Sequence, residues 1–138
     1  MSTDGVALLH RWGEEVWNKP REGAIEEMFA AGGLAFGLGP QPMGPQEFKQ
    51  YVQLMRGAFS DIHVKIDEGF QHGETVALRT TVEMVVRKTG KFIRVEGASF
   101  CRVRDGQIHE ARNFYDFLDM AIKVGAVPPD TLQKIFAG

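Results

Sequence analysis

The chain has 138 residues, of which 43% are hydrophobic and 25% charged, a balance typical of one globular domain. Sixteen basic against eighteen acidic residues give a net charge of −2, which argues against nucleic acid as a partner, because that usually demands a basic face. No run approaches the roughly 18 apolar residues of a membrane span, and residues 1–4 lack the features of a secretion signal. We therefore expect a single cytoplasmic domain over 1–138, with neither a membrane nor a nucleic acid as partner.

Apolar residues recur at spacings of three and four in the first sixty residues, which predicts three amphipathic helices. The first is capped by Ser2 or Thr3 and ends before Pro20, and the second continues from there to residue 32. A short extended piece at 34–38 leads into a loop. Pro45 then opens the third helix, which runs to residue 59 and has the clearest apolar face in the chain.

From residue 60 the hydrophobic period changes to two, which predicts strands at 62–66, 74–87, 92–104 and 107–115. Asp105-Gly106 predicts a tight hairpin between the last two strands, because both central residues of such a turn need positive φ. Consecutive strands with short turns pair antiparallel, and two short helices follow at 117–124 and 131–136. This order predicts an α+β fold, in which three N-terminal helices pack on one face of a cone-shaped, curved antiparallel sheet.

The two sides of the strand at 74–87 differ in character. Every second residue from Val76 to Val86, except at position 80, is apolar, whereas Arg79, Thr81 and Glu83 share the other side with Ala77 and Val85. The two sides cannot both be solvated, because one is this apolar and the other must meet the helices. Burial against a second subunit is the simplest explanation, so we predict a homodimer through the sheet.

The residue types present argue against a metal or cofactor site. Cys101 is the only cysteine, which excludes an internal disulfide and a cysteine-based metal site. The four histidines show no ligand spacing, and no phosphate-binding loop or dinucleotide fingerprint occurs. We expect neither a metal nor a cofactor.

Four side chains are candidates for acid–base chemistry. Asp116 lies where the last predicted strand stops and a helix begins, and a carboxylate beside a cavity is a candidate acid or base. Asn113 would orient a substrate, while Glu83 and Arg79 would set the electrostatics of the pocket. Other interpretations stay open, since Asp116 can cap the following helix and the strand charges can be solvated. In a strict strand Asn113 and Asp116 point to opposite faces, so both reach one cavity only through a bulge or a turn.

Aromatic and methionine side chains in the predicted helical layer have two interpretations. At helical spacing such residues usually form the core, but a layer this rich in them also fits the wall of a hydrophobic ligand site. Tyr51 adds a hydroxyl that needs a partner if it is buried. The candidate substrate-binding residues are Trp17, Phe36, Tyr51, Met55, Phe59 and Arg79.

The order of elements and several short motifs resemble the SnoaL-like polyketide cyclases, which have the nuclear transport factor two-like fold. The resemblance rests on Glu15-Val16-Trp17-Asn18, on Asp105-Gly106-Gln107-Ile108, and on Asp116 followed by Val124-Gly125. It implies that Asp116 is the general acid/base of an intramolecular ring closure on a polyketide-like carbonyl compound. Ketosteroid isomerase shares this fold and shows the general logic, in which an apolar site holds a carboxylate base.

The segment 112–116 also resembles the closing strand of limonene epoxide hydrolases, whose carboxylates flank an arginine and activate water. Here Asn113 takes a carboxylate position, Glu83 fits a second acid and Thr81 stands where the arginine would be. Three functions stay open: acid–base catalysis on a hydrophobic carbonyl, a non-catalytic carrier or sensor with the same pocket, and a structural dimer. A degenerate epoxide-hydrolase-like protein is a variant of the first.

Overall fold

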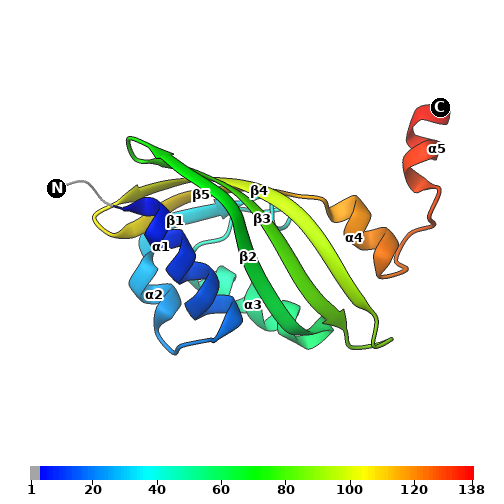
Figure 1. Ribbon diagram of the computed structural model, residues 1–138, viewed down its shortest axis with the longest axis horizontal. Coiled ribbons are helices and arrows are strands. Elements are labelled where there is room, and N and C mark those ends of the chain that lie inside the picture. The colour runs from blue at the N-terminus through cyan, green and yellow to red at the C-terminus, as the bar shows by residue number, and fades with distance from the viewer. Residues whose placement is uncertain (1–3) are drawn as a thin grey trace.

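The computed structural model describes residues 4–138 and contains one five-stranded sheet with the strand order β1-β5-β4-β3-β2. The N-terminal helices lie under the curved sheet, while α4 and α5 lie at one end of it (Figure 1). The predicted α+β class is therefore confirmed. The helices are α1 (Gly5–Trp12), the π-helix η1 (Gly13–Asn18), α2 (Ala24–Met28), α3 (Pro45–Ala58), α4 (Phe117–Lys123) and α5 (Thr131–Ala137). The strands are β1 (Phe29–Phe36), β2 (Phe59–His72), β3 (Thr75–Val86), β4 (Phe92–Arg104) and β5 (Gln107–Tyr115).

The four long strands form the expected antiparallel meander, because β2, β3, β4 and β5 each pair with the next strand in sequence. Asp105 and Gly106 have φ angles of 53° and 71°, as the tight hairpin requires, so that prediction is confirmed. The pairing of β2 with β3 shifts register twice, between Ser60 and His63 and between Ile66 and Glu68. Such bulges bend a strand, and they let this long strand curve around the helices.

The second predicted helix is wrong at its C-terminal end. It was expected to run to residue 32, but α2 ends at Met28 and Phe29 begins β1, which pairs parallel with β5. The sheet is therefore not purely antiparallel. Gly32 and Gly33, expected as a helix stop, lie inside the strand, and a Cβ at Gly33 would come within 2.6 Å of the Phe29 ring. Pairing with a distant strand overrides the local helical spacing here.

Local capping fixes where two of the helices start. The predicted caps Ser2 and Thr3 lie outside the described residues, and Asp4 is the N-cap of α1, where its carboxylate accepts the Ala7 N–H at 2.9 Å. Pro45 opens α3 as predicted, and the Glu47 carboxylate accepts the Gly44 N–H at 2.8 Å. These contacts satisfy backbone N–H groups in the first turns of α1 and α3.

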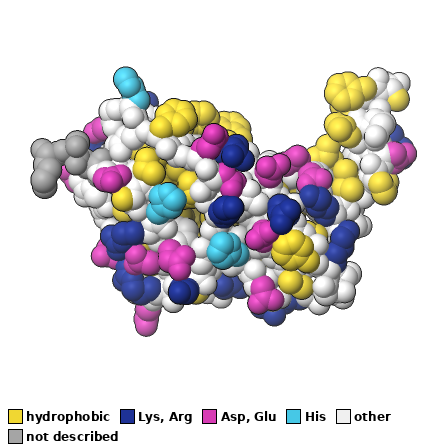
Figure 2. All heavy atoms as spheres, viewed as in Figure 1, with side chains coloured by type: hydrophobic (Ala, Val, Ile, Leu, Met, Phe, Trp, Pro, Cys, Tyr) yellow, Lys and Arg dark blue, Asp and Glu magenta, His cyan; other side chains and the backbone are white. Residues whose placement is uncertain are grey.

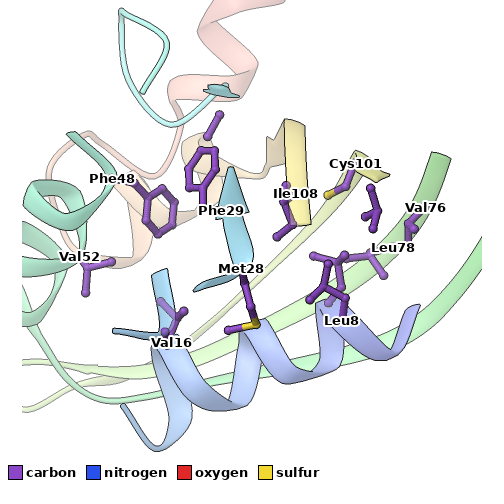
Figure 3. Packing of buried hydrophobic residues seen from close by; sticks show 14 residues of the cluster. Leu8, Val16, Met28, Phe29, Phe48, Val52, Val76, Leu78, Cys101 and Ile108 are labelled. Carbon is purple, nitrogen blue, oxygen red and sulfur yellow. The ribbon is translucent and has the colours of Figure 1, made fainter. Parts of the chain in front are cut away.

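Buried apolar residues form two clusters on the inner side of the sheet. The larger one joins the N-terminal helices to the sheet; in Figure 3 Phe29 and Phe48 lie side by side near Ile108, and Leu8 lies near Leu78. The ring centroids of Phe29 and Phe48 are 6.0 Å apart at 78°, an edge-on contact. The smaller cluster comes from the other end of β2, β3 and β4 and consists of Phe59, Ile62, Met84, Val86, Ile93 and Val95.

The outer side of the sheet and the C-terminal helix carry exposed apolar groups. Figure 2 shows hydrophobic side chains along the upper edge of the molecule, over the sheet, and again on α5, which projects from the body. α5 has no buried residue, and its Leu132, Ile135 and Phe136 are exposed. Of the helices in residues 4–138, none is both long and apolar enough to cross a membrane.

Candidate functional site

A cavity of about 120 Å³ lies between the inner face of the sheet and the helical layer. An apolar cavity of about 150 Å³ is known to hold one benzene molecule, so this space matches roughly one six-membered ring. None of the residues lining it is charged. Its aromatic and methionine lining residues include Trp12, Trp17, Phe48, Tyr51, Met55 and Met84.

A row of three paired residues brings polar groups to this cavity. Thr80 of β3 pairs with Gly97 of β4, and Gly97 pairs with Tyr115 of β5. A Cβ at Gly97 would come within 2.2 Å of the Tyr115 ring, so the ring lies directly across the glycine. Thr80 and Tyr115 both line the cavity, so this packing places two hydroxyl-bearing side chains in one part of its wall. Glycine at position 97 is what allows the contact across the strand.

A second pair of residues continues the polar cluster. Ser99 pairs with Asn113, and its hydroxyl donates to Asn113 Oδ1 at 2.8 Å. The Nδ2 of Asn113 donates to the Phe36 carbonyl at 3.0 Å, which ties β1 to the wall of the cavity. Thr80, Ser99, Asn113 and Tyr115 all line the cavity and form a polar part of its wall.

The groups that could ionise in the cavity wall are neutral at physiological pH. Burial raises the pKa of Tyr51 to about 12 and that of Cys101 to about 12. Burial also raises the pKa of Tyr115, although its hydrogen bonds with Thr80 and Ser99 act in the opposite direction. The cavity therefore offers hydrogen bonds from neutral hydroxyls and no ionised base.

Asp116 lies outside this cavity, in an open hollow on the surface next to the start of α4. Its carboxylate is exposed and accepts the Asp119 N–H at 3.0 Å, so it caps α4. The chain turns from β5 into α4 at this point and carries Asp116 away from the inner face. Asn113, Tyr115 and Phe117 line both spaces and form a common wall between the cavity and the hollow.

The expected placement of Glu83 at the pocket needs correction, whereas Arg79 is absent from the cavity but lines the hollow that holds Asp116. Both are on the outer face, where Glu83 accepts from Arg94 at 2.8 Å and Arg79 donates to Glu68 at 3.0 Å. Even-numbered residues of β3 point toward the helices, so the odd-numbered ones point away. The expectation that the apolar side of this strand meets a second subunit and the other side the helices is therefore wrong: the apolar side meets the helices and the charged side faces outward.

The structure brings Trp17, Tyr51, Met55 and Asn113 together around the cavity but leaves out two other expected wall residues. Phe36 is half-buried under the Arg112 guanidinium, whose carbon lies 4.3 Å from the ring centroid. Phe59 packs in the smaller core cluster.

Sequence reasoning missed three polar residues of the wall, Thr80, Ser99 and Tyr115. The available signal was a hydroxyl on the apolar side of a strand, because Thr80 lies between Leu78 and Val82 in the row of β3 residues that face inward. A buried hydroxyl needs a partner, so its presence there points to a polar cluster. Within residues 4–138 no three His, Cys, Asp or Glu side chains are placed to hold a metal ion.

Residues 7–122 match the family model of the SnoaL-like polyketide cyclases, which is most of the chain. The chain belongs to this family. Solved structures of similar fold include a SnoaL-like protein of Jannaschia sp. CCS1 assigned as a polyketide cyclase, with a TM-score of 0.80 and 18% identity over 92% of this chain and 95% of that one. IdmH of Streptomyces antibioticus, also assigned as a polyketide cyclase, gives a TM-score of 0.80 and 19% identity over 89% and 99% of the two chains.

A protein of Catenulispora acidiphila DSM 44928 with a ketosteroid isomerase-like fold, solved with trimethylamine, has a TM-score of 0.75 and 17% identity over 91% and 95% of the two chains. No curated protein sequence matches the chain significantly. At these identities the structural neighbours establish the SnoaL-like fold, and the reaction has to be argued from this chain's own site.

Proposed function

We propose that this SnoaL-like protein binds a small, neutral, hydrophobic compound in the cavity under the sheet. The observation that carries the proposal is a cavity with aromatic walls and no charged lining residue. Moving six carbons from water into the cavity contributes about 0.8 kcal/mol each, so the favourable binding free energy is at most roughly 5 kcal/mol. This free energy corresponds to a sub-millimolar dissociation constant. The carrier and the enzyme both need this binding step.

Titration with a small hydrocarbon, compared between the native chain and a variant with a bulkier cavity wall, tests the proposal. Methylcyclohexane is titrated into the protein and followed by tryptophan fluorescence, since Trp12 and Trp17 line the cavity. Met55→Phe adds bulk to the wall and should abolish saturable binding, whereas Leu54→Phe on the exposed side of the same helix should bind as the native chain does. Equal binding by both variants, or no binding by the native protein, would contradict the proposal.

Acid–base chemistry of the cyclase or isomerase type on a hydrophobic carbonyl compound is a second candidate function. The hollow that holds Asp116 supports it, because Phe114, Tyr115 and Phe117 also line that hollow and would give a carbonyl compound an apolar surface beside the carboxylate. In this proposal Asp116 takes a proton from the α-carbon of a compound bound in the hollow, giving an enolate and a carboxylic acid, and returns it. Asn113 holds the wall in place. Water activation of the epoxide hydrolase kind is not proposed, because Asn113 is neutral and Glu83 lies on the outer face.

Exchange of the α-hydrogens of cyclohexanone in deuterated water, followed by NMR, tests the second candidate. Asp116→Asn keeps a good helix cap but removes the base, and it should slow exchange by at least about 100-fold. Asp119→Asn is the matched control, because Asp119 is in the first turn of the same helix and pairs with Lys123. If Asp116→Asn exchanges as fast as the native protein, Asp116 is not the base and the carrier function stands alone.

We also propose that a second copy of the chain covers the outer face of the sheet. Phe70, Ala77 and Phe100 are paired neighbours across three strands, and Phe114 lies 6.3 Å from Phe100 between ring centroids. Phe70, Phe100 and Phe114 are 69%, 50% and 62% exposed, a patch larger than the scattered apolar residues of a monomer surface. Acidic and basic side chains alternate around it, including Arg102 with Glu110, so a two-fold axis can set opposite charges face to face.

Sedimentation at micromolar concentration tests the dimer. The native chain should run as a dimer and Phe100→Glu as a monomer. Leu54→Glu, on the helical side of the molecule, should remain a dimer. A native chain that sediments as a monomer would contradict the proposed partner.

A further inference from the structure

We propose that the surface hollow beside α4 is the entrance to the cavity, and that the Phe117 side chain is the gate between the two spaces. This inference rests on the proposed binding function and adds the route by which a ligand reaches its site. Asn113, Tyr115 and Phe117 line both the cavity and the hollow, so a direct passage between the two spaces leads past these three side chains.

Two of these three side chains are held in place. Asn113 accepts from Ser99 at 2.8 Å and donates to the Phe36 carbonyl at 3.0 Å, so both ends of its amide are used. The Tyr115 ring packs directly against Gly97 of the neighbouring strand. Both residues belong to β5, which is paired on its two sides with β1 and β4. They are therefore the fixed part of the common wall.

Phe117 is the part of the wall that can move. It is the first residue of α4 and is 40% exposed. Of the described residues that line the cavity it is the only exposed one, since all the others are buried or half-buried. Exposed side chains change rotamer within picoseconds to nanoseconds, and a phenylalanine breaks no hydrogen bond when it does so. A rotamer that turns the ring away from the Tyr115 ring, 6.2 Å away between centroids, opens the wall.

The helix that carries the gate is fastened at both ends, so the side chain moves and the helix does not. At the start of α4 the Asp116 N–H donates to the Glu96 carbonyl at 3.0 Å, and at its end the Lys123 Nζ donates to the Arg94 carbonyl at 2.6 Å. Met120, one turn after the gate, packs against the smaller core cluster. Figure 1 shows α4 at the end of the sheet, away from α1 and α2. A ligand that uses this entrance passes the Asp116 carboxylate on its way.

A gate has a kinetic signature that separates it from an ordinary wall residue. A side chain that closes over the empty and the occupied cavity alike slows entry and exit by the same factor, so the dissociation constant does not change. A residue that only packs against the bound ligand changes the dissociation rate and leaves the association rate constant as it was. The association rate constant is therefore the quantity that tests the inference.

Methylcyclohexane is the probe. Its dissociation constant comes from the tryptophan fluorescence titration and its dissociation rate from NMR line shapes, and the two together give the association rate constant. Phe117→Ala should raise the association rate constant at least about fivefold and leave the dissociation constant within about threefold of native. Met120→Ala is the matched control, because Met120 is in the same helix and lines the cavity but not the hollow. It should weaken binding without changing the association rate constant.

A bulky label in the hollow tests the entrance without altering the cavity. Glu96 lines the hollow only, and Glu96→Cys coupled to a bulky maleimide should lower the association rate constant at least about fivefold. Arg94→Cys with the same label is the control, since Arg94 is exposed on the same side of β4 and lines neither space. Both are made in the Phe100→Glu background, so that a label cannot act by separating two copies. Cys101, the only native cysteine, is buried.

The inference requires both the faster entry of Phe117→Ala and the slower entry of the labelled Glu96→Cys. Absence of either effect, or an equal effect in its control, would overturn the inference and leave the binding function intact, because the ligand would then enter elsewhere. If Phe117→Ala fails to fold, the two labelled variants decide the question. Failure of methylcyclohexane to bind the native chain would overturn the binding function and the gate with it.

Discussion

Replacing Asn113 by aspartate tests how far the inner wall depends on a single amide. In the native side chain the oxygen accepts from Ser99 at 2.8 Å and the nitrogen donates to the Phe36 carbonyl at 3.0 Å. An ionised carboxylate keeps the first bond but replaces the second with a contact between two oxygens that carry no proton. Because the two side chains have nearly the same shape, packing is unchanged and the electrostatic effect is isolated.

The expected magnitude follows from that one lost contact. Leaving a partly buried carbonyl without its donor costs about 1–3 kcal/mol. Unfolding entropy of about 2.1 cal/mol/K per residue gives roughly 0.3 kcal/mol per kelvin for a chain of this length, so a loss of 2 kcal/mol lowers Tm by about 7 °C. Contact with the carbonyl favours the protonated acid, so the folded state raises the pKa of the new carboxyl above its unfolded value of about 3.9.

The sign of the pH dependence follows from this raised pKa. Below the unfolded pKa the protonated carboxyl donates to the Phe36 carbonyl and the variant should be nearly as stable as the native chain. Stability then falls as pH rises from the unfolded pKa through the folded pKa, because over that range the folded state still holds a proton that the unfolded state has released.

Urea unfolding at pH 4, 5.5 and 7 measures the difference between Asn113→Asp and the native protein. Asn113→Ala is the matched control, since it loses both hydrogen bonds and its deficit should not change with pH. An aspartate variant as stable as the native protein at pH 7, or a deficit equal at all three pH values, would refute the reasoning.

Three further predictions concern other parts of the structure. Gly97→Ala adds a Cβ within 2.2 Å of the Tyr115 ring and should lower the free energy of unfolding in urea by about 1–3 kcal/mol. The control is Gly57→Ala, whose Cβ would meet open space in α3 and should raise that free energy by up to about 1 kcal/mol. Equal effects of the two variants would contradict the packing of Tyr115 against Gly97. Because burial raises the pKa of Cys101 from 9.0 to about 12, stability should fall above pH 9 as the unfolded thiol ionises, by up to about 1.4 kcal/mol per pH unit. Cys101→Ala should flatten that loss between pH 9 and 10, and an unchanged slope would show that the thiol is not its cause. Truncation after Pro128 removes α5, which has no buried residue, and should change the free energy of unfolding by no more than about 0.5 kcal/mol; a larger loss would mean that α5 packs against the body.

Most of the fold follows from local patterns in the sequence. The hairpin at Asp105 and Gly106 is fixed by two residues that accept positive φ, and the start of α3 by Pro45. The failure at the end of α2 has a clear cause. Ile25, Met28 and Phe29 have helical spacing, but Phe29 and the glycines after it gain more by extending along β5, a strand that comes eighty residues later in the chain.

The candidate site was less accessible to sequence reasoning. Trp17, Tyr51 and Met55 could be expected at the wall because aromatic and methionine residues on one helix side must face the sheet. Glu83 and Arg79 were misplaced because alternation separates two faces of β3 without saying which one meets the helices. Asp116 is carried to the surface by the turn into α4, and only the course of the backbone reveals that.

The sequence by itself determined the succession of helices and strands, the turn between β4 and β5, and the division of each strand into two sides, because these depend on neighbours a few residues away. The tertiary structure decided which side became the inside, how β1 joined the sheet, and that the Tyr115 ring packs against Gly97. Those outcomes depend on the register between segments far apart in the chain, and register is set when all the strands and helices pack together.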